Sequence, residues 1–475
     1  MSKDYSRDYK RSCPPAVLIV CIVLVLVSAL AVAWLWLKPD TTQQPSSTRP
    51  GPQLSTDPSD DDPLPSETES EPTETETEPE PVHVIATATI ASTGDVLMHM
   101  PVVNTTKQAD GSYDFTSIFK YISSYATEAD YAVANLETTL CGTDNGYAYS
   151  GYPCFNCPDE VVDGAMAAGF DMFTTVNNHC YDTSTVGLLR TLTVLEEKGM
   201  DSLGTMNTAE DPKYIIKDIN GIKIGMIAYT YSTMGDSGRP MINGIPTKAD
   251  SAGLINTFDI ERLADFYTEI DGHIQSMKEE GAEAVVAFMH WGYEYQTIPS
   301  DHQTKMAQKL CDLGIDVIIG GHPHVVQPVD LLTSTEDPNH KTVCLYSMGN
   351  AVSNQRLGLI KAISTAHTED GVLFSVTFSK YSDGTVVLEG TDLIPCWVNM
   401  HTTNGVKEYN ILPLDSETKD QWQELYGLSD TGFKAASNSY DRTMKLVGEG
   451  LEECQTYLAQ AKADREAAYL AEVQK

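Results

Sequence analysis

Two histidines stand one residue apart directly after a run of β-branched apolar residues. Residues 315–319 predict a buried strand, and the sequence Gly-Gly-His-Pro-His follows at 320–324. The two glycines predict a tight turn that presents His322 and His324 beyond the strand. The carboxyl end of a strand is where open α/β sheets build their sites, and imidazole is a common ligand of divalent transition metals. The spacing therefore favours a metal site over two structural histidines.

Other predicted strands end in polar side chains in the same way. The strands at 83–93, 131–134, 171–176 and 284–289 lead into Gly-Asp, Asn-Leu-Glu, Asn-Asn-His and His-Trp-Gly-Tyr-Glu. Strands that share a sheet bring their carboxyl ends to one edge, so these side chains are expected around a common centre. Carboxylates, an amide and imidazoles suit two divalent ions about 3.5–4 Å apart. The expected set is Asp95, Glu137, Asn178, His179, His290, His322 and His324.

Helices alternate with these strands, which indicates an α/β domain. They are predicted at 115–127, 158–168, 184–198, 259–280 and 301–313, with further strands at 222–229 and 342–346. Taken singly, each motif has an ordinary interpretation: Gly-Asp is a turn, Asn-Asn-His a loop and Asn-Leu-Glu a strand end. With Ser-Met-Gly-Asn at 347–350 after the strand at 342–346, six such endings follow in succession, which is not expected by chance.

The first 82 residues predict a membrane anchor and a spacer. Residues 16–37 form an apolar run that, at ~1.5 Å per residue, spans the ~30 Å hydrocarbon layer. Basic residues within 1–15 predict a single-pass protein of the cell membrane with a cytoplasmic N-terminus and an extracellular remainder. A cleaved signal peptide is the alternative, although Trp34 and Trp36 favour a retained anchor. Residues 38–82, rich in Pro, Ser, Thr and Glu, predict a disordered acidic linker.

Charge and cysteine content limit the partners. The 475-residue chain has a formal net charge of -36, which argues against nucleic acid as a partner, since phosphate backbones need a basic surface. Cys141, Cys154 and Cys157 lie close in sequence, so either a bridge from Cys141 to one of the other two or free thiols are expected. No second cysteine pair follows at zinc-ribbon spacing.

The ordered motifs resemble those of the CapA, or poly-γ-glutamate capsule synthesis, family, whose usual layout also includes an N-terminal anchor. That family resembles the calcineurin-like metallophosphoesterases. The resemblance implies a four-layer α/β/β/α sandwich with a dinuclear metal centre over about residues 83–400. Beyond it, the residue pattern of 401–475 predicts a helical extension, whose last helix at 441–473 either packs on the sandwich or pairs with another copy. The motifs are Gly94-Asp95, Asn135-Leu136-Glu137, Asn177-Asn178-His179, His290-Trp291-Gly292 with Glu294, Gly321-His322-Pro323-His324 and Tyr346-Ser347-Met348-Gly349-Asn350.

The resemblance also implies a role for each matching residue. One ion, of Mn, Fe or Zn type, would be bound by Asp95 and His324. The other would be bound by Asn178, His290 and His322. Glu137 would bridge the two ions, and His179 would act as general acid. The substrate would contact Asn135, Asn177, Trp291, Glu294 and Asn350.

Several residues keep two interpretations open. Asp182 either orients the imidazole of His179 or caps the helix predicted at 184. Trp291, with Tyr293 and Tyr295 beside it, either lines a substrate groove or packs beside the strand end.

The first motif departs from that of the phosphoesterases. Leu97 stands where they have a histidine, and His99 lies two residues further on. Glu137 replaces an aspartate and is one methylene longer. These departures imply that one metal site is weak or empty.

Three functions follow from these expectations. The first is an anchored protein acting in synthesis, export or attachment of an anionic polymer, through hydrolysis or transfer at a phosphoester or acyl bond. The second is a polymer-binding or scaffold subunit of a membrane complex that includes other capsule-synthesis proteins. The third is a general surface phosphoesterase, for which no basic nucleotide pocket is found in the sequence.

Overall fold

The computed structural model describes residues 81–144, 146–403 and 405–473. The predicted anchor at 16–37 and nearly all of the predicted linker lie outside these residues. Within them, no helix is both long and apolar enough to cross a membrane.

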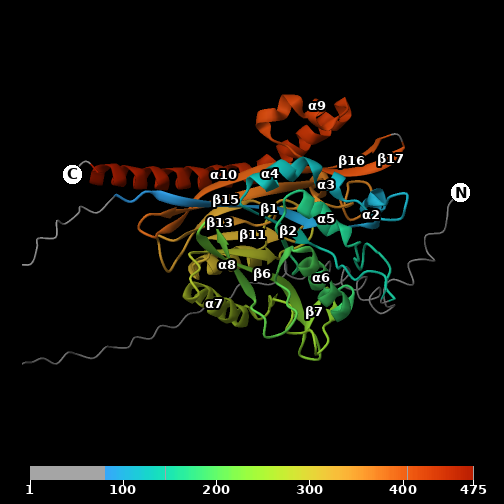
Figure 1. Ribbon diagram of the computed structural model, residues 1–475, viewed down its shortest axis with the longest axis horizontal. Coiled ribbons are helices and arrows are strands. Elements are labelled where there is room, and N and C mark those ends of the chain that lie inside the picture. The colour runs from blue at the N-terminus through green and yellow to red at the C-terminus, as the bar shows by residue number, and fades with distance from the viewer. Residues whose placement is uncertain (1–80, 145, 404, 474–475) are drawn as a thin grey trace, which may run out of the picture.

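Two mixed β-sheets form the centre of the fold (Figure 1). The first has the order β17-β16-β15-β1-β2-β3-β4, with β14 beside β1. Its central strands β1, β2 and β3 run parallel, and β15 and β16 extend it antiparallel. The bounds are β1 (Val84–Val96), β2 (Tyr131–Leu136), β3 (Met172–Thr174), β4 (Asp201–Leu203), β14 (Asn350–Val352), β15 (Asp370–Tyr381), β16 (Val386–Thr403) and β17 (Val406–Pro413).

The second sheet has the order β12-β13-β11-β10-β6-β7-β8, and β5 and β9 also pair with β6. Its strands β6, β10, β11 and β13 run parallel to one another. The bounds are β5 (Tyr214–Ile219), β6 (Ile222–Met234), β7 (Pro240–Ile242), β8 (Ile245–Pro246), β9 (Thr257–Asp259), β10 (Ala284–His290), β11 (Val317–Gly321), β12 (Val329–Thr333) and β13 (Lys341–Leu345).

The inner faces of the two sheets share one apolar core. Alternate residues of a strand point to opposite faces, so one strand contributes to two cores. Val286 of β10 and Val133 of β2 belong to the inner core between the sheets. Val285 packs against the helices outside the second sheet, and Ala132 packs against those outside the first. Each sheet is therefore buried on both faces, which explains why its central strands are almost wholly apolar.

Helices cover the outer faces of both sheets. Those outside the second sheet are α7 (Leu263–Glu279) and α8 (Asp301–Asp312). The first sheet is covered mainly by α2 (Met100–Thr106), α3 (Thr116–Phe119), η2 (Lys120–Ile122), α4 (Ser123–Glu128) and α5 (Glu160–Ala167). One face of α6 (Ser184–Lys198) enters the inner core and the other contacts the outer core. The α/β class predicted from the sequence is confirmed.

Some predicted elements differ from the observed ones. The helix expected at 115–127 is divided by the 3₁₀ turn η2, and the boundary expected at residue 400 falls inside β16. The first sheet continues to Pro413 because β17 pairs with β16 along its whole length. β17 is buried from Tyr409 to Pro413, whereas Val406 and Lys407 are exposed and Glu408 is half-buried. The strand therefore shows too little apolar alternation to be predicted.

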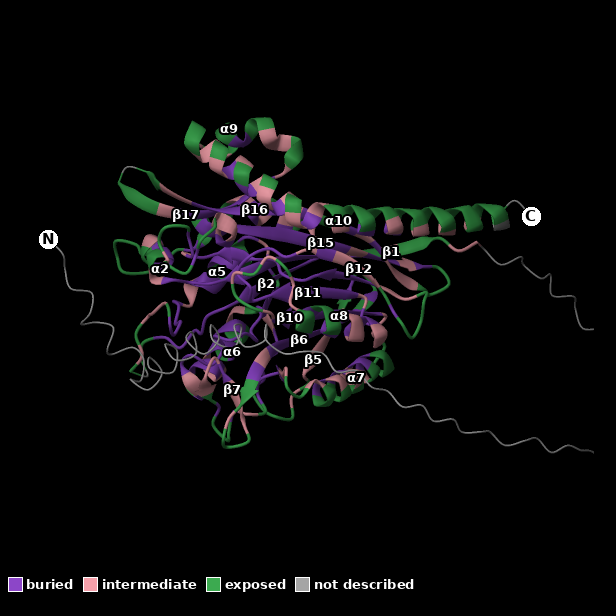
Figure 2. Ribbon diagram, turned by 180° about the vertical axis from the view of Figure 1, so that it is seen from behind, coloured by how far each residue is buried: buried purple, intermediate pink, exposed green. Residues whose placement is uncertain are grey.

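The chain ends in the 44-residue helix α10 (Asp430–Val473), which follows the short elements η4 (Ser416–Gln421) and α9 (Trp422–Tyr426). It lies along β16 of the first sheet and the edge strand β12 of the second. Val447, Leu451 and Leu458 enter the inner core, whereas the end of the helix beyond them is largely exposed (Figure 2). Of the two alternatives for the C-terminal helix, packing back on the domain is therefore the one observed.

The contact between α10 and β12 depends on Gly450. A Cβ atom at this position would lie 1.7 Å from the carbonyl oxygen of Val329, whereas one at Gly448 would meet nothing closer than Met444 Cε at 3.7 Å. We expect Gly450→Ala to lower the free energy of unfolding by roughly 1–3 kcal/mol, because the added methyl group would push the helix away from the backbone of Val329 in β12. Gly448→Ala is the matched control and should stabilise by up to ~1 kcal/mol through helix propensity. Urea unfolding measures both, and equal effects would contradict the docking.

Candidate metal centre

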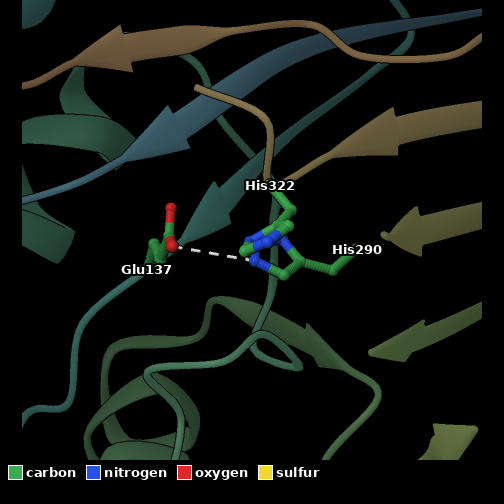
Figure 3. Close-up of side chains that lie close together, drawn as sticks. All are labelled: Glu137, His290 and His322. Atoms are coloured by element: carbon green, nitrogen blue, oxygen red, sulfur yellow. Dashed lines mark ion pairs between the residues drawn. The ribbon is translucent and has the colours of Figure 1, made fainter. Parts of the chain in front are cut away.

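The polar strand ends meet between the carboxyl edges of the two sheets. Glu137 follows β2 of the first sheet, whereas His290 ends β10 and His322 follows β11 of the second (Figure 3). The expectation that strands of a single sheet supply the centre is wrong, because periodicity cannot assign strands to sheets. Two groups of side chains have ligand atoms close enough to hold a metal ion, namely Glu137, His290 and His322, and Asp95, Glu137 and His324.

Glu137 is common to both groups and is completely buried. Neither of its carboxylate oxygens has a hydrogen-bond partner among the described residues. Its nearest basic atoms are Nε2 of His290 at 3.6 Å and Nε2 of His324 at 3.8 Å from Oε1. An ionised carboxylate in such a place needs a compensating cation, since burial without a partner costs several kcal/mol, of order ~3 or more.

Burial is the main cause of the pKa shifts of the buried carboxyl and imidazole groups. Burial, with the neighbouring charge of Asp95, raises the pKa of Glu137 well above its usual value. Burial, reinforced by the other histidines, lowers the pKa of His290 and of His322 far below the usual value. Both imidazoles are therefore neutral, the form that binds a metal ion.

His324 is held by two acceptors on one ring nitrogen. Nδ1 lies 3.1 Å from Asp95 Oδ2 and 3.1 Å from Asn350 Oδ1, so Nδ1 carries the proton in the neutral ring. Nε2 then has the free lone pair and faces Glu137. Burial opposes the charged form, but the hydrogen bond and charge of Asp95 outweigh it and raise the pKa of His324. A metal ion near Nε2 would reverse this effect.

Asn178 reaches the same region from the loop after β3. Its Oδ1 lies 2.7 Å from Nε2 of His290, and the side chain is buried. An amide oxygen and an imidazole nitrogen that converge in this way can share one cation. Tyr231 also approaches, its ring centroid 4.7 Å from that of His322. Tyr231 was not predicted from the sequence, because the strand predicted to end at residue 229 continues to Met234.

The Gly-Gly-His-Pro-His segment works differently from the predicted glycine turn. Gly320 and Gly321 still belong to β11, and a Cβ on Gly320 would lie 1.9 Å from the carbonyl oxygen of Tyr346. Glycine is needed at this position because the backbone of Tyr346 packs directly against it, which leaves no room for a side chain. The histidines themselves turn the chain, with φ of 96° at His322 and 56° at His324. Such left-handed conformations are strained for non-glycine residues and cluster at functional sites.

His179 lies beside the metal groups with a carboxylate behind it. Its Nδ1 is 2.8 Å from Asp182 Oδ2, an oxygen that also accepts from the amide of Phe155 at 2.6 Å. The ring packs edge-on against Phe155 at 4.6 Å between centroids. Helix α6 has Thr183 as its N-cap, without a capping side chain. Of the two interpretations of Asp182, the structure favours the one in which it orients His179.

Asn135 and Asn177 make their contacts inside the protein. Asn135 Nδ2 donates to Asp95 Oδ1 at 2.7 Å, and its own oxygen accepts from Asn177 at 3.1 Å. Asn177 also bonds the carbonyl of Leu136 and accepts from the amide of His179. These two residues, both buried, therefore hold the candidate metal ligands in place, where the sequence had predicted substrate contacts. Asn350 likewise contacts His324 and is completely buried.

The aromatic residues after β10 divide into two kinds. Trp291 is 1% exposed and donates to the carbonyl of Tyr346, so it belongs to the outer core and lines no groove. Tyr293 and Glu294 are exposed. Tyr295, at φ 64°, bonds through its amide to the carbonyl of Pro323 and lies 6.2 Å from the ring of His324. Of the two residues expected to bind substrate here, only Glu294 remains accessible.

Neither Leu97 nor His99 takes the place of the histidine that the phosphoesterases have in their first motif. Leu97 is buried, and its backbone amide donates to Val352. His99 Nδ1 lies 3.3 Å from the carbonyl of Leu97 and accepts from the amide of Asn354 at 3.3 Å. Burial lowers the pKa of His99 to about 3. His99 is absent from both groups that could hold a metal, so it does not substitute for the histidine.

The cysteines near the site play no part in it. Cys141 and Cys157 are buried free thiols, so the expected bridge from Cys141 is not formed and the alternative of free thiols describes both. Burial raises the pKa of each thiol, which keeps them protonated and unreactive.

The donor set fits divalent cations. Both oxygens of Glu137 and Nδ1 of His322 are buried and have no hydrogen-bond partner within the described part of the chain. They stand among a second carboxylate, two further imidazoles and an amide oxygen, which is the mixed oxygen and nitrogen set that Mn, Fe and Zn accept.

The unpartnered carboxylate predicts a gain in stability from Glu137→Gln in metal-free protein. The raised pKa means that folded Glu137 binds its proton more tightly than the unfolded chain, so stability falls as pH rises above the usual glutamate pKa. With chelator present, we expect the variant to exceed the wild type by about 1–3 kcal/mol at pH 8, and by less at pH 5. Urea unfolding at both pH values measures this. A variant weaker than wild type at pH 8 would contradict it.

The sequence of the chain is similar to those of known proteins of one family. The sequence model described as "Bacterial capsule synthesis protein PGA_cap" matches residues 89–355, which include every residue expected to bind a metal. The chain is 26% identical over 310 residues to the capsule biosynthesis protein CapA of Bacillus anthracis, covering 65% of this chain and 66% of that protein. It is 28% identical over 264 residues to the PGA biosynthesis protein CapA of Bacillus subtilis (strain 168), covering 55% and 62%.

A third relative is a probable polyglutamine synthesis accessory protein of Mycobacterium tuberculosis, 25% identical over 219 residues, 43% of this chain and 52% of that protein. The chain thus covers less than two thirds of the length of each of these relatives. The family match nevertheless extends over more than half of the chain, from β1 to the loop after β14. The chain therefore belongs to the bacterial capsule synthesis protein (PGA_cap) family.

Proposed function

We propose that the protein acts in the synthesis, export or attachment of an anionic surface polymer of the poly-γ-glutamate type. It would do so through a centre of two divalent cations and a metallophosphoesterase-like α/β/β/α sandwich. The observation that carries the proposal is Glu137, a buried carboxylate without a hydrogen-bond partner, shared by two groups of metal-binding side chains. The names of the Bacillus relatives support the polymer class.

Each cation would have its own ligands besides Glu137. Asp95 and His324 would hold one, and His290 and His322, with the amide oxygen of Asn178, would hold the other. When bound, such cations polarise a phosphoryl or carbonyl oxygen and lower the pKa of a bound water. Leu97 leaves the Asp95 side with one ligand fewer than phosphoesterases have, so that site would bind more weakly.

His179 would supply a proton to the leaving group. Its Nδ1 is engaged by Asp182, which leaves Nε2 as the nitrogen that can face a substrate. Asp182 Oδ1 has no hydrogen-bond partner among the described residues, so the carboxylate serves only the imidazole and the amide of Phe155. The reaction class is hydrolysis or transfer at a phosphoester or acyl bond.

A second candidate is a polymer-binding or scaffold subunit of a membrane complex. It is favoured by one observation, the buried Leu97 at the position where the phosphoesterases have a histidine. A general surface phosphoesterase is the third. The proposed setting is the outer face of the cell membrane, with residues 16–37 as the anchor. The polymer would repel a chain of net charge -36, so bound cations would also offset like charges across the site.

Elemental analysis tests the proposal first. Protein comprising residues 83–475, loaded with Mn²⁺, Fe²⁺ or Zn²⁺ and desalted, should retain about two equivalents per chain. It is then assayed on a phosphodiester, bis(p-nitrophenyl) phosphate, and on γ-linked polyglutamate. Two equivalents with turnover of either substrate would support the enzyme. Two equivalents without turnover would favour the scaffold, and no retained metal would refute the centre.

Replacing His179 separates proton transfer from metal binding. We expect His179→Gln to retain its metal and to lower kcat by about 10²–10⁴-fold, the usual contribution of a general acid. Asp182→Asn should lower kcat less, because His179 remains. His302→Gln is the control, since His302 is exposed on α8. Steady-state kinetics with metal analysis of the same samples measures both properties. Full activity in His179→Gln would show that His179 is not the general acid.

A further inference from the structure

Two side chains of the C-terminal helix α10 form hydrogen bonds with the buried carboxylate of Asp370, the first residue of β15. Arg442 donates to Asp370 through Nη2 at 2.6 Å and through Nε at 2.9 Å, and Ser439 donates to the same carboxylate at 2.6 Å. Asp370 is 1% exposed. A fork-shaped pair of hydrogen bonds of this kind fixes the orientation as well as the distance of the two groups.

The segment held by α10 is bonded to the loop that carries Asn350. In the 3₁₀ turn η3 (Ala366–Glu369), the carbonyl of Thr368 accepts from Asn350 Nδ2 at 2.9 Å. Next to Asp370, Gly371 pairs with Gly349, and a Cβ on Gly371 would lie 2.2 Å from the carbonyl oxygen of Asn350. With no room for adjustment, a displacement of Asp370 would displace Asn350.

Asn350 in turn holds His324 on two sides. Its Oδ1 is 3.1 Å from Nδ1 of the imidazole, and its Nδ2 donates to the backbone carbonyl of His324 at 3.3 Å. His324 sits in a left-handed conformation, which persists only where the surroundings enforce it. Hydrogen bonds to the outer nitrogen of a ligand imidazole set its direction, and losing them typically costs about 10–100-fold in metal affinity.

We propose that Arg442 and Ser439 are positioning residues for the metal ligand His324, acting through Asp370, Thr368 and Asn350. The inference rests on the metal centre of the proposed function and extends it to a helix outside the family match at 89–355. A purely structural role would dock α10 without affecting the metal. The two roles differ in what happens at one of the two cation sites.

Arg442→Gln in the full chain tests the relay, with Co²⁺ as the probe and its visible absorption as the readout. We expect the affinity for one equivalent of Co²⁺ to fall by at least about 10-fold, while the affinity for the other is unchanged. Arg442→Lys, which keeps the charge but not the fork, should recover only part of the loss. Asn350→Ala should weaken the same equivalent, and combining it with Arg442→Gln should add little.

Gln455→Ala is the matched control. Gln455 lies on the same helix and donates to the carbonyl of Thr391 at 3.1 Å, away from Asp370. This variant should lose thermal stability without any change in Co²⁺ affinity. If Arg442→Gln does not fold, Ser439→Ala takes its place, and a several-fold loss in the same equivalent is expected.

Two outcomes would overturn the inference. If wild type binds two equivalents and both Arg442→Gln and Ser439→Ala keep each affinity within twofold, the relay is wrong and the centre stands. If wild type binds no Co²⁺, the proposed centre itself fails and takes the relay with it.

Discussion

The site is organised around a carboxyl group, that of Glu137, enclosed between two β-sheets. Glu137 is buried, has no hydrogen-bond partner in the described chain, and lies beside a second carboxylate, Asp95. Around this pair the protein places three imidazoles, two of them on strained turns at His322 and His324, and buried amides that contact these side chains. None of these choices improves a core, since apolar residues would pack as well at lower cost. They are consistent with a group of side chains that could hold a cation.

The scaffold explains how such a site is kept in place. Each ligand follows a central strand that is buried on both faces, so the strand end cannot shift without disturbing two cores. Asn135, Asn177 and Asn350 then connect ligands of different strands through side-chain hydrogen bonds. Opposing sheets thus supply the ligands, and buried amides fix their relative positions.

The sequence allowed the α/β class, several elements and the ligand residue types to be predicted, because these depend on local signals. Helix 184–198 was predicted at its observed bounds. Roles that depend on direction were not accessible: spacing cannot tell whether Asn135 faces a substrate or a ligand, or whether Trp291 lines a groove or fills a core. The partnership of Asp370 with Arg442, 72 residues apart, and the hairpin of β16 and β17 likewise have no local signature.

The pairing of β1 with β15 has a consequence for how the chain acquires this structure. Thr93 pairs with Leu373, and the inner core is closed only by residues near Leu458 of α10. During synthesis, the first strand of the domain therefore emerges long before its antiparallel neighbour β15, and α10 follows later still. Contacts so distant in sequence make folding slow, and exposed strand edges invite aggregation in the interval.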